Sequence, residues 1–443
     1  MKIHSTYSAK IKHYNKIFKS TVEKYRSSVD FFINVCLEKW DMISEISGSK
    51  AKQRFVETIT VRTGDNFVPE YDFSSFMYKF PSYLRRAAIS EAIGKVLSYK
   101  SNLLNWMNNP VGKKPSVPKA GYVYPAMYKD NMYEQVDEYT FKIKVFIRNT
   151  WDWLTVELRK SDIDYINRYC KDRKQCVPTL QKRGKEWFLD FSFEENVNLE
   201  STDVYDRIIL SVDLGINSAC TCSVMDSDGT ILGRRFLRLL SEQDSLNHAV
   251  NRIKKAQQHG NRKTPRLWSK AKGINNDIAV KTAQFIIDTA VLFNVDVIVF
   301  EHLELNGKKH GSKKQKLHLW RSSYVQSMVT DKAHRLLIRV SHVNAWNTSA
   351  FAFDGSGKVL RGKDADFPTY SLCKFQNGKV YNCDLSASYN IGARYFIREI
   401  LKSFSERERL LLEAKVPQVS KRSTCTLSAL ISLNAVVKLN AVA

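Results

Sequence analysis

The sequence lacks any apolar stretch long enough to cross a membrane. A transmembrane helix needs about 20 consecutive apolar residues, and no run of even about 18 occurs here. The N-terminal stretch MKIHSTYSAKIKHYNK also lacks the apolar core of a secretory signal. We therefore expect a soluble, cytoplasmic protein with no membrane partner.

The chain also lacks a regular cysteine framework. Its eight cysteines stand at positions 36, 170, 176, 220, 222, 373, 383 and 425, without the dense spacing of a small disulfide-linked secreted domain. Cys220 and Cys222 alternate within an apolar run, which predicts two ordinary core positions. A reducing compartment without disulfides fits this usage.

Acidic residues are clearly outnumbered by basic ones. The 443 residues include 69 Lys and Arg against 45 Asp and Glu, which gives a formal net charge of +24. With 12% aromatic residues, this excess indicates a polyanionic partner rather than a small acidic substrate. A membrane surface would also attract such charge, but the missing apolar run argues against it.

The apolar spacing changes along the N-terminal half. It is helical over residues 14–47 and 74–107, and it alternates in strand fashion over 137–196, in FKIKVFI, WLTVEL and EWFLDFSF. A loop rich in Pro, Gly and Lys lies between them at 110–125. We expect a helical block followed by a small β-barrel, within a chain of two to four domains.

Three carboxylates carry the chemical signal. Asp213 in RIILSVDLGIN and Glu301 in VDVIVFEHLE each close a short apolar run of strand type, and Asp384 in YNCDLSASYNIGARYF opens a helix-like stretch. Taken singly, each also fits a turn or capping carboxylate. Together they fit a phosphodiester-cleaving site in which acidic oxygens hold two Mg²⁺ ions roughly 4 Å apart.

The segments around these carboxylates follow a recognisable order. After Asp213 we expect a strand at 218–225, a hairpin turn at 226–229 and a third strand at 231–239. A pair of helices is expected over 241–293, before the strand and the helix that carry the other two carboxylates. This is the order of a ribonuclease H-like α/β fold. A helix is predicted over 317–340.

A basic loop and an aromatic segment are candidates for nucleic-acid binding. The loop carries Lys308, Lys309, Lys313, Lys314 and Lys316, and it fits a phosphate contact or a solvated surface equally well. The aromatic segment carries Tyr71, Phe73, Phe76, Tyr78, Phe80 and Tyr83. Such a run more often forms a helix core than a base-stacking surface. Arg85 and Arg86 would suit phosphate or base-edge contacts.

Five segments together resemble the RuvC nuclease domain of TnpB-type proteins. These are VDLGIN, DVIVFEHL, HLWRSSYVQSMVTDKAHR, NAWNTS and NCDLSASYNIGARYF. TnpB-type proteins are RNA-guided endonucleases of insertion sequences, and compact type V CRISPR effectors descend from them. The resemblance is specific over about 208–400 and looser in KPSVPKAGYVYPAMYKDN and FPSYLRRAAI.

The resemblance implies an α/β multidomain fold, in which a RuvC domain joins an N-terminal β-barrel wedge domain with a helical recognition insertion. The implied parts are a first wedge strand at 1–13, a recognition lobe at 14–110, a wedge β-barrel at 118–198, a RuvC domain at 205–415 with an insert at 345–383 that contacts the target strand, and an apolar C-terminal tail at 416–443.

The resemblance also implies a function. Asp213, Glu301 and Asp384 would bind two Mg²⁺ ions and form the catalytic site. The partners would be a guide RNA and double-stranded target DNA, opened beside a short flanking motif and cut by this single site, while base pairing supplies specificity. A monomer is favoured over a dimer, in the cytoplasm of a bacterium and associated with the nucleoid.

The chain departs from this family in one respect. Many members carry two CxxC pairs between the second and third catalytic segments, which form a zinc site. Here the corresponding stretch has only Cys373 and Cys383. Because a structural zinc needs four nitrogen or sulfur ligands, we expect no zinc there and expect packing alone to hold the segment.

Two other functions fit parts of the pattern. An RNA-guided DNA-binding repressor without cleavage would share the fold, but all three carboxylates are present. A guide-free transposase or resolvase of ribonuclease H fold would share the metal chemistry. Its acids, however, typically run Asp, Asp, Glu, whereas the middle one here is Glu301.

Overall fold

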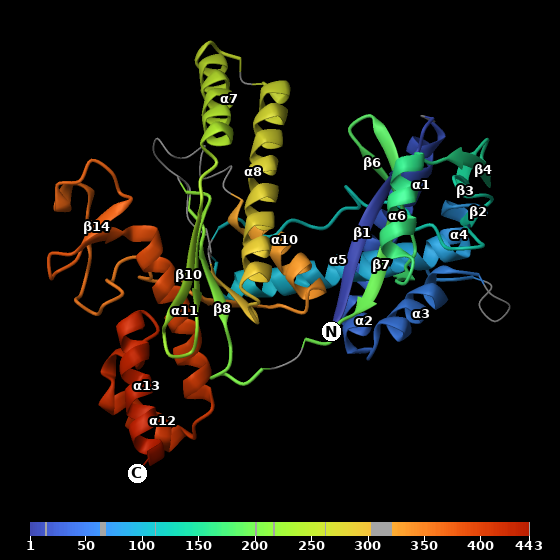
Figure 1. Cartoon of the computed structure of the whole chain (residues 1–443). Helices are drawn as coiled ribbons and strands as arrows, with labels where there is room; N and C mark the ends of the chain where they lie inside the picture. Colours follow the sequence, from blue (N-terminus) through green and yellow to red (C-terminus); the bar gives the residue numbers. More distant parts are fainter. Residues whose placement is uncertain are drawn as a thin grey trace. The chain divides into compact units, whose positions relative to one another are not determined.

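A computed structural model of the chain describes residues 1–13, 16–62, 68–110, 112–199, 202–215, 218–261, 263–302 and 321–442. The chain divides into two compact units (Figure 1). The N-terminal unit is Lys2–Asn196, and the C-terminal unit is Val197–Ala443 together with Met1. No helix among the described residues is long and apolar enough to span a bilayer.

Helices make up the first part of the N-terminal unit. They are α1 (Ile17–Glu38), α2 (Trp40–Glu45), α3 (Ser49–Thr60), α4 (Phe73–Phe76) and α5 (Ser82–Asn108). The helical spacing predicted from the sequence is therefore confirmed in both blocks. The second block starts with the short α4 and restarts at Ser82, directly after Pro81, because the residue before a proline disfavours helical geometry.

The strands of this unit form two sheets. One contains β1 (Lys2–Lys10), β5 (Lys174–Gln175), β6 (Thr179–Arg183) and β7 (Glu186–Asn196), in the order β1-β7-β5 with β6 also pairing β7. The other is β2 (Tyr133–Gln135), β3 (Thr140–Ile147) and β4 (Thr150–Glu157), and α6 (Lys160–Cys170) follows it.

The β-barrel predicted for 118–198 is not confirmed by this arrangement. Outside the named strands, the described residues of this unit add three isolated β-bridges. These join Ile11 to Leu158, Ala126 to Thr179 and, locally, Lys129 to Tyr133. The alternation of apolar residues correctly predicted strands. A closed barrel stays a prediction.

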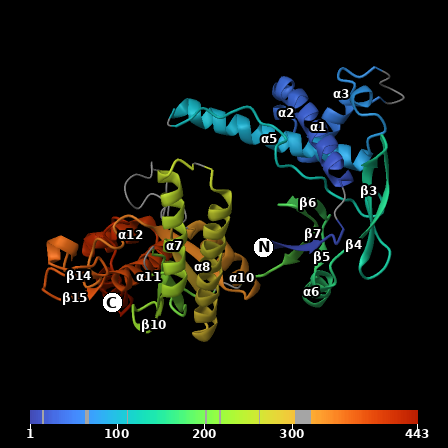
Figure 2. The same cartoon turned by 90° about the horizontal axis from the view of Figure 1, so that it is seen from above.

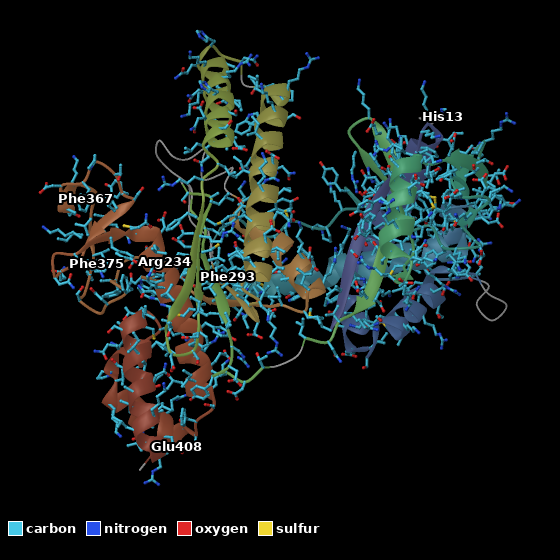
Figure 3. The ribbon with its side chains drawn as sticks, viewed as in Figure 1. His13, Arg234, Phe293, Phe367, Phe375 and Glu408 are labelled. Atoms are coloured by element: carbon cyan, nitrogen blue, oxygen red, sulfur yellow. The ribbon has the colours of Figure 1, made fainter. Side chains whose placement is uncertain are left out.

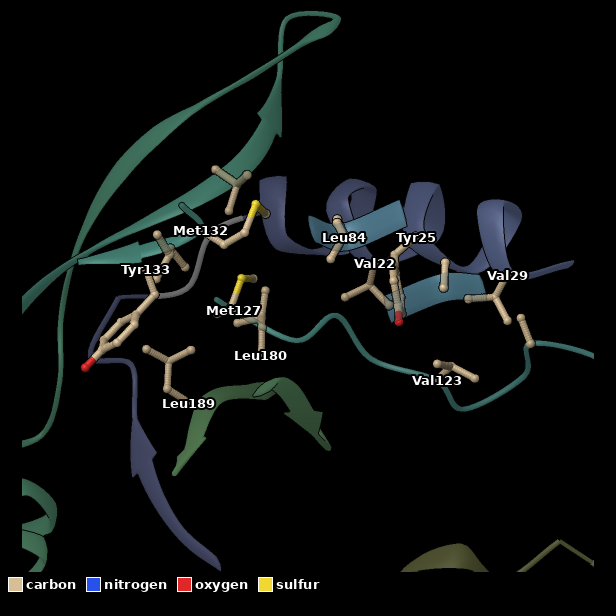
Figure 4. Packing of buried hydrophobic residues seen from close by; sticks show 14 of the residues in the cluster. Val22, Tyr25, Val29, Leu84, Val123, Met127, Met132, Tyr133, Leu180 and Leu189 are labelled. Atoms are coloured by element: carbon tan, nitrogen blue, oxygen red, sulfur yellow. The ribbon is translucent and has the colours of Figure 1, made fainter. Parts of the chain in front are cut away.

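One apolar core joins the helices and strands of the N-terminal unit. Val22, Tyr25 and Val29 of α1 and Leu84 of α5 all belong to this core (Figure 4). Methionines and leucines from the strand region, such as Met127, continue the same cluster. Figure 2 shows α1, α2, α3 and α5 gathered together within this unit.

The centre of the C-terminal unit is a five-stranded sheet. Its strands are β8 (Ile209–Asp213), β9 (Cys220–Met225), β10 (Ile231–Leu237), β11 (Val297–His302) and β12 (Arg339–Asn344), in the order β10-β9-β8-β11-β12. The pairs β10–β9 and β9–β8 are antiparallel, whereas β8–β11 and β11–β12 are parallel. The succession of β8, β9, β10, two helices and β11 along the chain is the one predicted from the sequence, whereas β12 was not predicted.

The last strand of this sheet corrects one prediction. The helix predicted over 317–340 is shorter, because α10 spans Ser322–Arg335 and β12 begins at Arg339. Leu337 has a positive φ of 63°, which ends the helical geometry and turns the chain into the sheet. Residues 317–320 of the predicted helix lie outside the described residues.

Helices flank this sheet on both sides. The long pair α7 (Leu240–Gln258) and α8 (Pro265–Leu292) lies side by side (Figures 1 and 2). On the other side, α11 (Cys383–Lys402) packs against β8, β9 and α13 (Leu427–Val442), with α12 (Glu406–Lys415) between the two helices in sequence. The apolar tail thus packs against the rest of this unit.

Glycine is required at one turn of this sheet. Gly229 closes the β9–β10 hairpin with a φ of +87°, and a Cβ atom there would lie 3.0 Å from Leu427 of α13. The hairpin turn predicted at 226–229 is confirmed by this geometry.

A small three-stranded sheet, β13 (Leu360–Arg361), β14 (Leu372–Lys374) and β15 (Val380–Asn382), precedes α11.

Candidate active site

Two of the three carboxylates lie at one edge of the central sheet. Asp213 is the last residue of β8, and Glu301 lies near the end of β11. Because β8 and β11 are parallel neighbours with Val212 opposite Phe300, the next residue of each strand emerges at the same edge. Ligand sites in parallel sheets form at such carboxyl ends.

The third carboxylate arrives from a helix. Asp384 is the second residue of α11, in its first turn, and the helix is capped by Asn382, whose side chain accepts a hydrogen bond from the Leu385 amide. A carboxylate in the first helical turn is stabilised by the helix dipole. Since α11 packs on β8, β9 and β11, its N-terminal turn brings Asp384 close enough to Asp213 for the two charges to interact.

The crowding of these carboxylates changes their acidity. Burial raises the pKa of Asp213 well above its usual value, and the nearby charges of Glu301 and Asp384 raise it further, while Arg361 opposes them. Burial also raises the pKa of Glu301 and of Asp384. Such crowding of like charges is typical of functional sites, because a bound cation relieves it.

The donor set fits a hard divalent cation. All three side chains offer carboxylate oxygen, the ligand that Mg²⁺ prefers. The ligand oxygens of Asp213, Glu301 and Asp384 do not all lie within 4.8 Å of one another, so the group is wider than a single-ion cage.

A buried arginine, which the sequence did not reveal as functional, supports this edge of the sheet. Arg394 of α11 is 5% exposed and interacts electrostatically with Glu301. It donates hydrogen bonds to the carbonyl oxygens of Asn344 and Trp346, at 2.6 and 2.9 Å. It also donates to the carbonyls of Ser423 and Cys425. Arg394 therefore joins the end of β12 to the C-terminal segment.

Three polar residues complete the support of Glu301. The Thr348 side chain lies near the Glu301 carboxylate and lowers its pKa, which opposes the rise caused by burial. Gln326 of α10 donates to the backbone carbonyl of Glu301 at 2.9 Å. The buried Asn390 of α11 donates to the carbonyls of Thr348 and Phe351. The sequence analysis did not single out these residues, because Asn390 and Arg394 show their partners only in the folded chain.

Basic and aromatic side chains surround the carboxylates. Arg238 and Arg361 lower the pKa of Asp384 and partly compensate the negative charge. Arg234 of β10 lies over the ring of Tyr389 of α11, 5.7 Å from its centroid. Trp346, whose backbone Arg394 holds, is 73% exposed. This edge of the sheet thus offers positive charge and an open aromatic surface.

The residues predicted to contact nucleic acid differ in their exposure to solvent, and some lie outside the described residues. Lys308, Lys309, Lys313 and Lys314 lie outside the described residues. In the aromatic segment Phe73 and Phe80 are core residues, Tyr71 is partly buried, and the residues exposed to solvent are Phe76, Tyr78 and Tyr83.

The exposed aromatic residues differ in how free their rings are. Phe76 stacks on Phe31 with ring centroids 5.2 Å apart, and Tyr83 contacts Tyr128 at 5.4 Å. Tyr78 is the most exposed, at 72%. Arg85 and Arg86 both pair with Glu57 of α3, Arg85 at 2.8 Å, so they also hold α5 against α3.

Cys373 and Cys383 lie together in a small apolar cluster. Both are buried, next to Ala352 and Phe375, and Cys373 donates to the carbonyl of Tyr381 at 3.5 Å. Phe375 and Phe367 belong to this part of the chain (Figure 3). Among the described residues, no group of three or more potential metal ligands includes Cys373 or Cys383.

We predict that this segment folds without zinc. A Cys373→Ser/Cys383→Ser variant should keep its melting temperature within a few degrees of wild type, and chelators should not unfold the wild-type protein, since a structural zinc would contribute much of the folding energy. Calorimetry with and without chelator measures this. Chelator-induced melting that both serines abolish would contradict the prediction.

Comparison with known proteins places this site in context. The family model Aq_aa04 matches residues 5–147. A TnpB-like protein, aq_aa05 of Aquifex aeolicus (strain VF5), is 29% identical over 238 residues, which are 48% of this chain and 74% of the relative. The uncharacterized protein aq_aa04 of the same strain is 28% identical over 128 residues, 26% of this chain and 71% of that protein.

A solved structure shares the fold. It is the Cas12f1–sgRNA–target DNA complex, whose protein is 15% identical, with a TM-score of 0.53 over 85% of this chain and 81% of that one. The resemblance to TnpB-type proteins and type V effectors, inferred from the sequence, is confirmed. At this identity the structural likeness establishes a mixed α/β fold of the Cas12f1 kind.

Proposed function

We propose that this chain is an RNA-guided, Mg²⁺-dependent DNA endonuclease with a single nuclease site. The observation that carries the proposal is the convergence of Asp213, Glu301 and Asp384 from β8, β11 and α11, where burial raises the pKa of all three and the charges of Glu301 and Asp384 raise that of Asp213 further. The likeness to a TnpB-like protein and to Cas12f1 supports it.

The carboxylates would hold the metal ions. When bound, two Mg²⁺ ions would activate a water molecule and stabilise the leaving oxygen of the phosphodiester. Thr348 and Arg394 orient Glu301 and limit the rise of its pKa. Arg361 acts on both aspartates of the site, and its charge would also help to attract the DNA phosphates.

The nucleic-acid partners follow from charge and from the relative. A net charge of +24 exceeds what a short DNA contact requires, and suits a folded guide RNA plus a heteroduplex of about 20 base pairs. In the related complex Cas12f1 is bound to sgRNA and target DNA. By this account the N-terminal unit reads the flanking motif, with Tyr78 as an exposed stacking candidate.

The division of labour between the parts is proposed on the same basis. The helices within 14–110 would serve as the recognition lobe, and the sheets of the N-terminal unit would serve as the wedge. The segment 205–415, which contains the five-stranded sheet, would be the RuvC nuclease domain, with 345–383 touching the target strand. We propose a monomer as the working form.

Purified protein, expressed together with the DNA that flanks its gene, should carry a defined RNA. The reason is that the positively charged protein should attract and retain its polyanionic guide RNA. Sequencing of the copurified RNA measures this, and a discrete species from the flanking DNA is expected. Protein that is free of RNA yet cuts DNA sequence-specifically would instead favour a guide-free transposase or resolvase.

A further inference from the structure

One face of the β1-β7-β5 sheet carries a cluster that the nuclease site does not use. In the antiparallel register His4 of β1 lies directly opposite Glu194 of β7. Neighbouring residues across a sheet project their side chains to the same face, so the imidazole and the carboxylate lie side by side. On this face the side chains are polar, whereas Phe193, the next residue of β7, is buried in the core.

A cysteine joins this pair from the third strand. Lys174 of β5 lies opposite Glu194, and two residues later the Cys176 amide donates to the Ser192 carbonyl at 2.7 Å, which continues the pairing. Cys176 therefore projects to the same face as His4 and Glu194. The ligand atoms of the three side chains all lie within 4.8 Å of one another.

Cys176 differs from the other cysteines of the chain. Seven of the eight are buried and act as small apolar core residues, whereas Cys176 is partly exposed. Core packing therefore does not explain a thiol at this position. His4 and Glu194 lie in paired strands, and Cys176 directly follows β5 with its amide bonded to Ser192, so backbone pairing keeps the three positions near one another, as a metal site requires.

We propose that His4, Cys176 and Glu194 bind a divalent cation of the zinc class, with water as the fourth ligand. The imidazole nitrogen, thiolate sulfur and carboxylate oxygen are the three donor types that proteins use for Zn²⁺. Ligand bonds of about 2.0–2.3 Å place the donor atoms roughly 3.3–3.8 Å apart in a tetrahedron. Side-chain rotations that move the donor atoms by about 1 Å would therefore complete the site. The proposal is independent of the nuclease function.

A lysine competes with the metal for the carboxylate. The Lys2 ammonium lies 2.8 Å from Glu194, and that of Lys174 lies 3.8 Å away. Both lysine side chains are well exposed, at 61% and 75%, and can turn into solvent when a cation binds. The bound ion would link β1 to two strands about 170 residues later in the chain, and would stabilise the N-terminal unit.

Cobalt titration of the full-length, reduced protein tests the proposal, because a thiolate bound to Co²⁺ gives a charge-transfer absorption that carboxylate ligands do not. Excess Mg²⁺ keeps the Asp213 site occupied. A saturable thiolate band at one equivalent is expected, and Zn²⁺ should displace it. Cys176→Ser should abolish the band, and His4→Ala should weaken binding at least about tenfold, since even partners of metal ligands contribute about 10–100-fold.

Two control variants make the result decisive. Lys2→Ala should tighten cobalt binding several-fold, because it removes the competing ammonium while leaving the three ligands in place. Cys373→Ser/Cys383→Ser should leave the band unchanged. No thiolate band in the wild type, a band that survives Cys176→Ser, or a band lost with the Cys373 and Cys383 thiols would each overturn the proposal.

Discussion

Asp213→Ala is expected to lower the rate of DNA cleavage at least about a thousandfold, while RNA and DNA binding stay within about twofold of wild type. Asp213 interacts with both other carboxylates of the site, so its removal dismantles the metal positions. Metal ions supply several kcal/mol of transition-state stabilisation, and about 4 kcal/mol corresponds to a thousandfold in rate. Single-turnover cleavage and filter binding measure the two effects.

A matched control comes from the other end of the sheet. Asp226 follows β9, which runs antiparallel to β8, and its carboxylate accepts a hydrogen bond from the Thr230 amide in the hairpin turn. Asp226→Ala should leave cleavage nearly unchanged. If Asp213→Ala still cuts at the wild-type rate in Mg²⁺, the site has been assigned to the wrong carboxylates.

The pH dependence of stability offers a second readout of the same residue. The folded-state pKa of Asp213 is raised above its unfolded value, so the metal-free folded protein holds a proton that the unfolded chain releases. The stability that this proton contributes is present at low pH, and it is lost as pH rises through the folded-state pKa of Asp213. Without metal, the melting temperature of Asp213→Asn should therefore exceed that of wild type at pH 7.5, and this difference should be smaller at pH 5.

Arg394→Met is expected to lower the melting temperature by about 6–12 °C and to reduce cleavage strongly. Arg394 donates to four backbone carbonyls, of which the bond to Cys425 is buried and the other three are partly buried, and a buried carbonyl left unpaired costs about 1–3 kcal/mol. A loss of about 3 kcal/mol shifts the melting temperature by about 2–4 °C per kcal/mol in a unit of this size. Cleavage should fall because the turn at 344–348 carries Thr348, which orients Glu301.

Arg398 provides the control for this variant. It lies one helical turn further along α11 and donates to the His342 carbonyl at 2.8 Å, but a third of its side chain is exposed. Arg398→Met should therefore cost much less stability. A requirement for more Mg²⁺ in Arg394→Met, at a temperature where it stays folded, would show that Arg394 positions the metal site. Unchanged melting and cleavage would contradict its proposed role.

The C-terminal half of the fold could be predicted from the sequence because its signals are local. Short β-branched runs ending in Asp213 and Glu301 predicted β8 and β11, and parallel neighbours necessarily bring their ends together. β12 was missed because RVSHVN carries a cation and a histidine within a short edge strand, which obscures the apolar alternation.

Other features depend on contacts between distant residues. The pairing of β1 with β7 joins residues that are about 190 positions apart, and no local pattern encodes that register. The cluster of His4, Cys176 and Glu194 therefore could not be anticipated. Likewise, Arg394 is one more basic residue in the sequence until four carbonyls are seen around it.

Reprogramming the guide tests the central claim most directly. The wild-type protein should be loaded with either of two guide RNAs that differ only in the pairing segment, and offered two duplexes that share one flanking sequence. The account predicts that each guide directs Mg²⁺-dependent cutting of its own duplex alone, because base pairing carries specificity. Cutting that ignores the guide, or that proceeds equally without RNA, would contradict it.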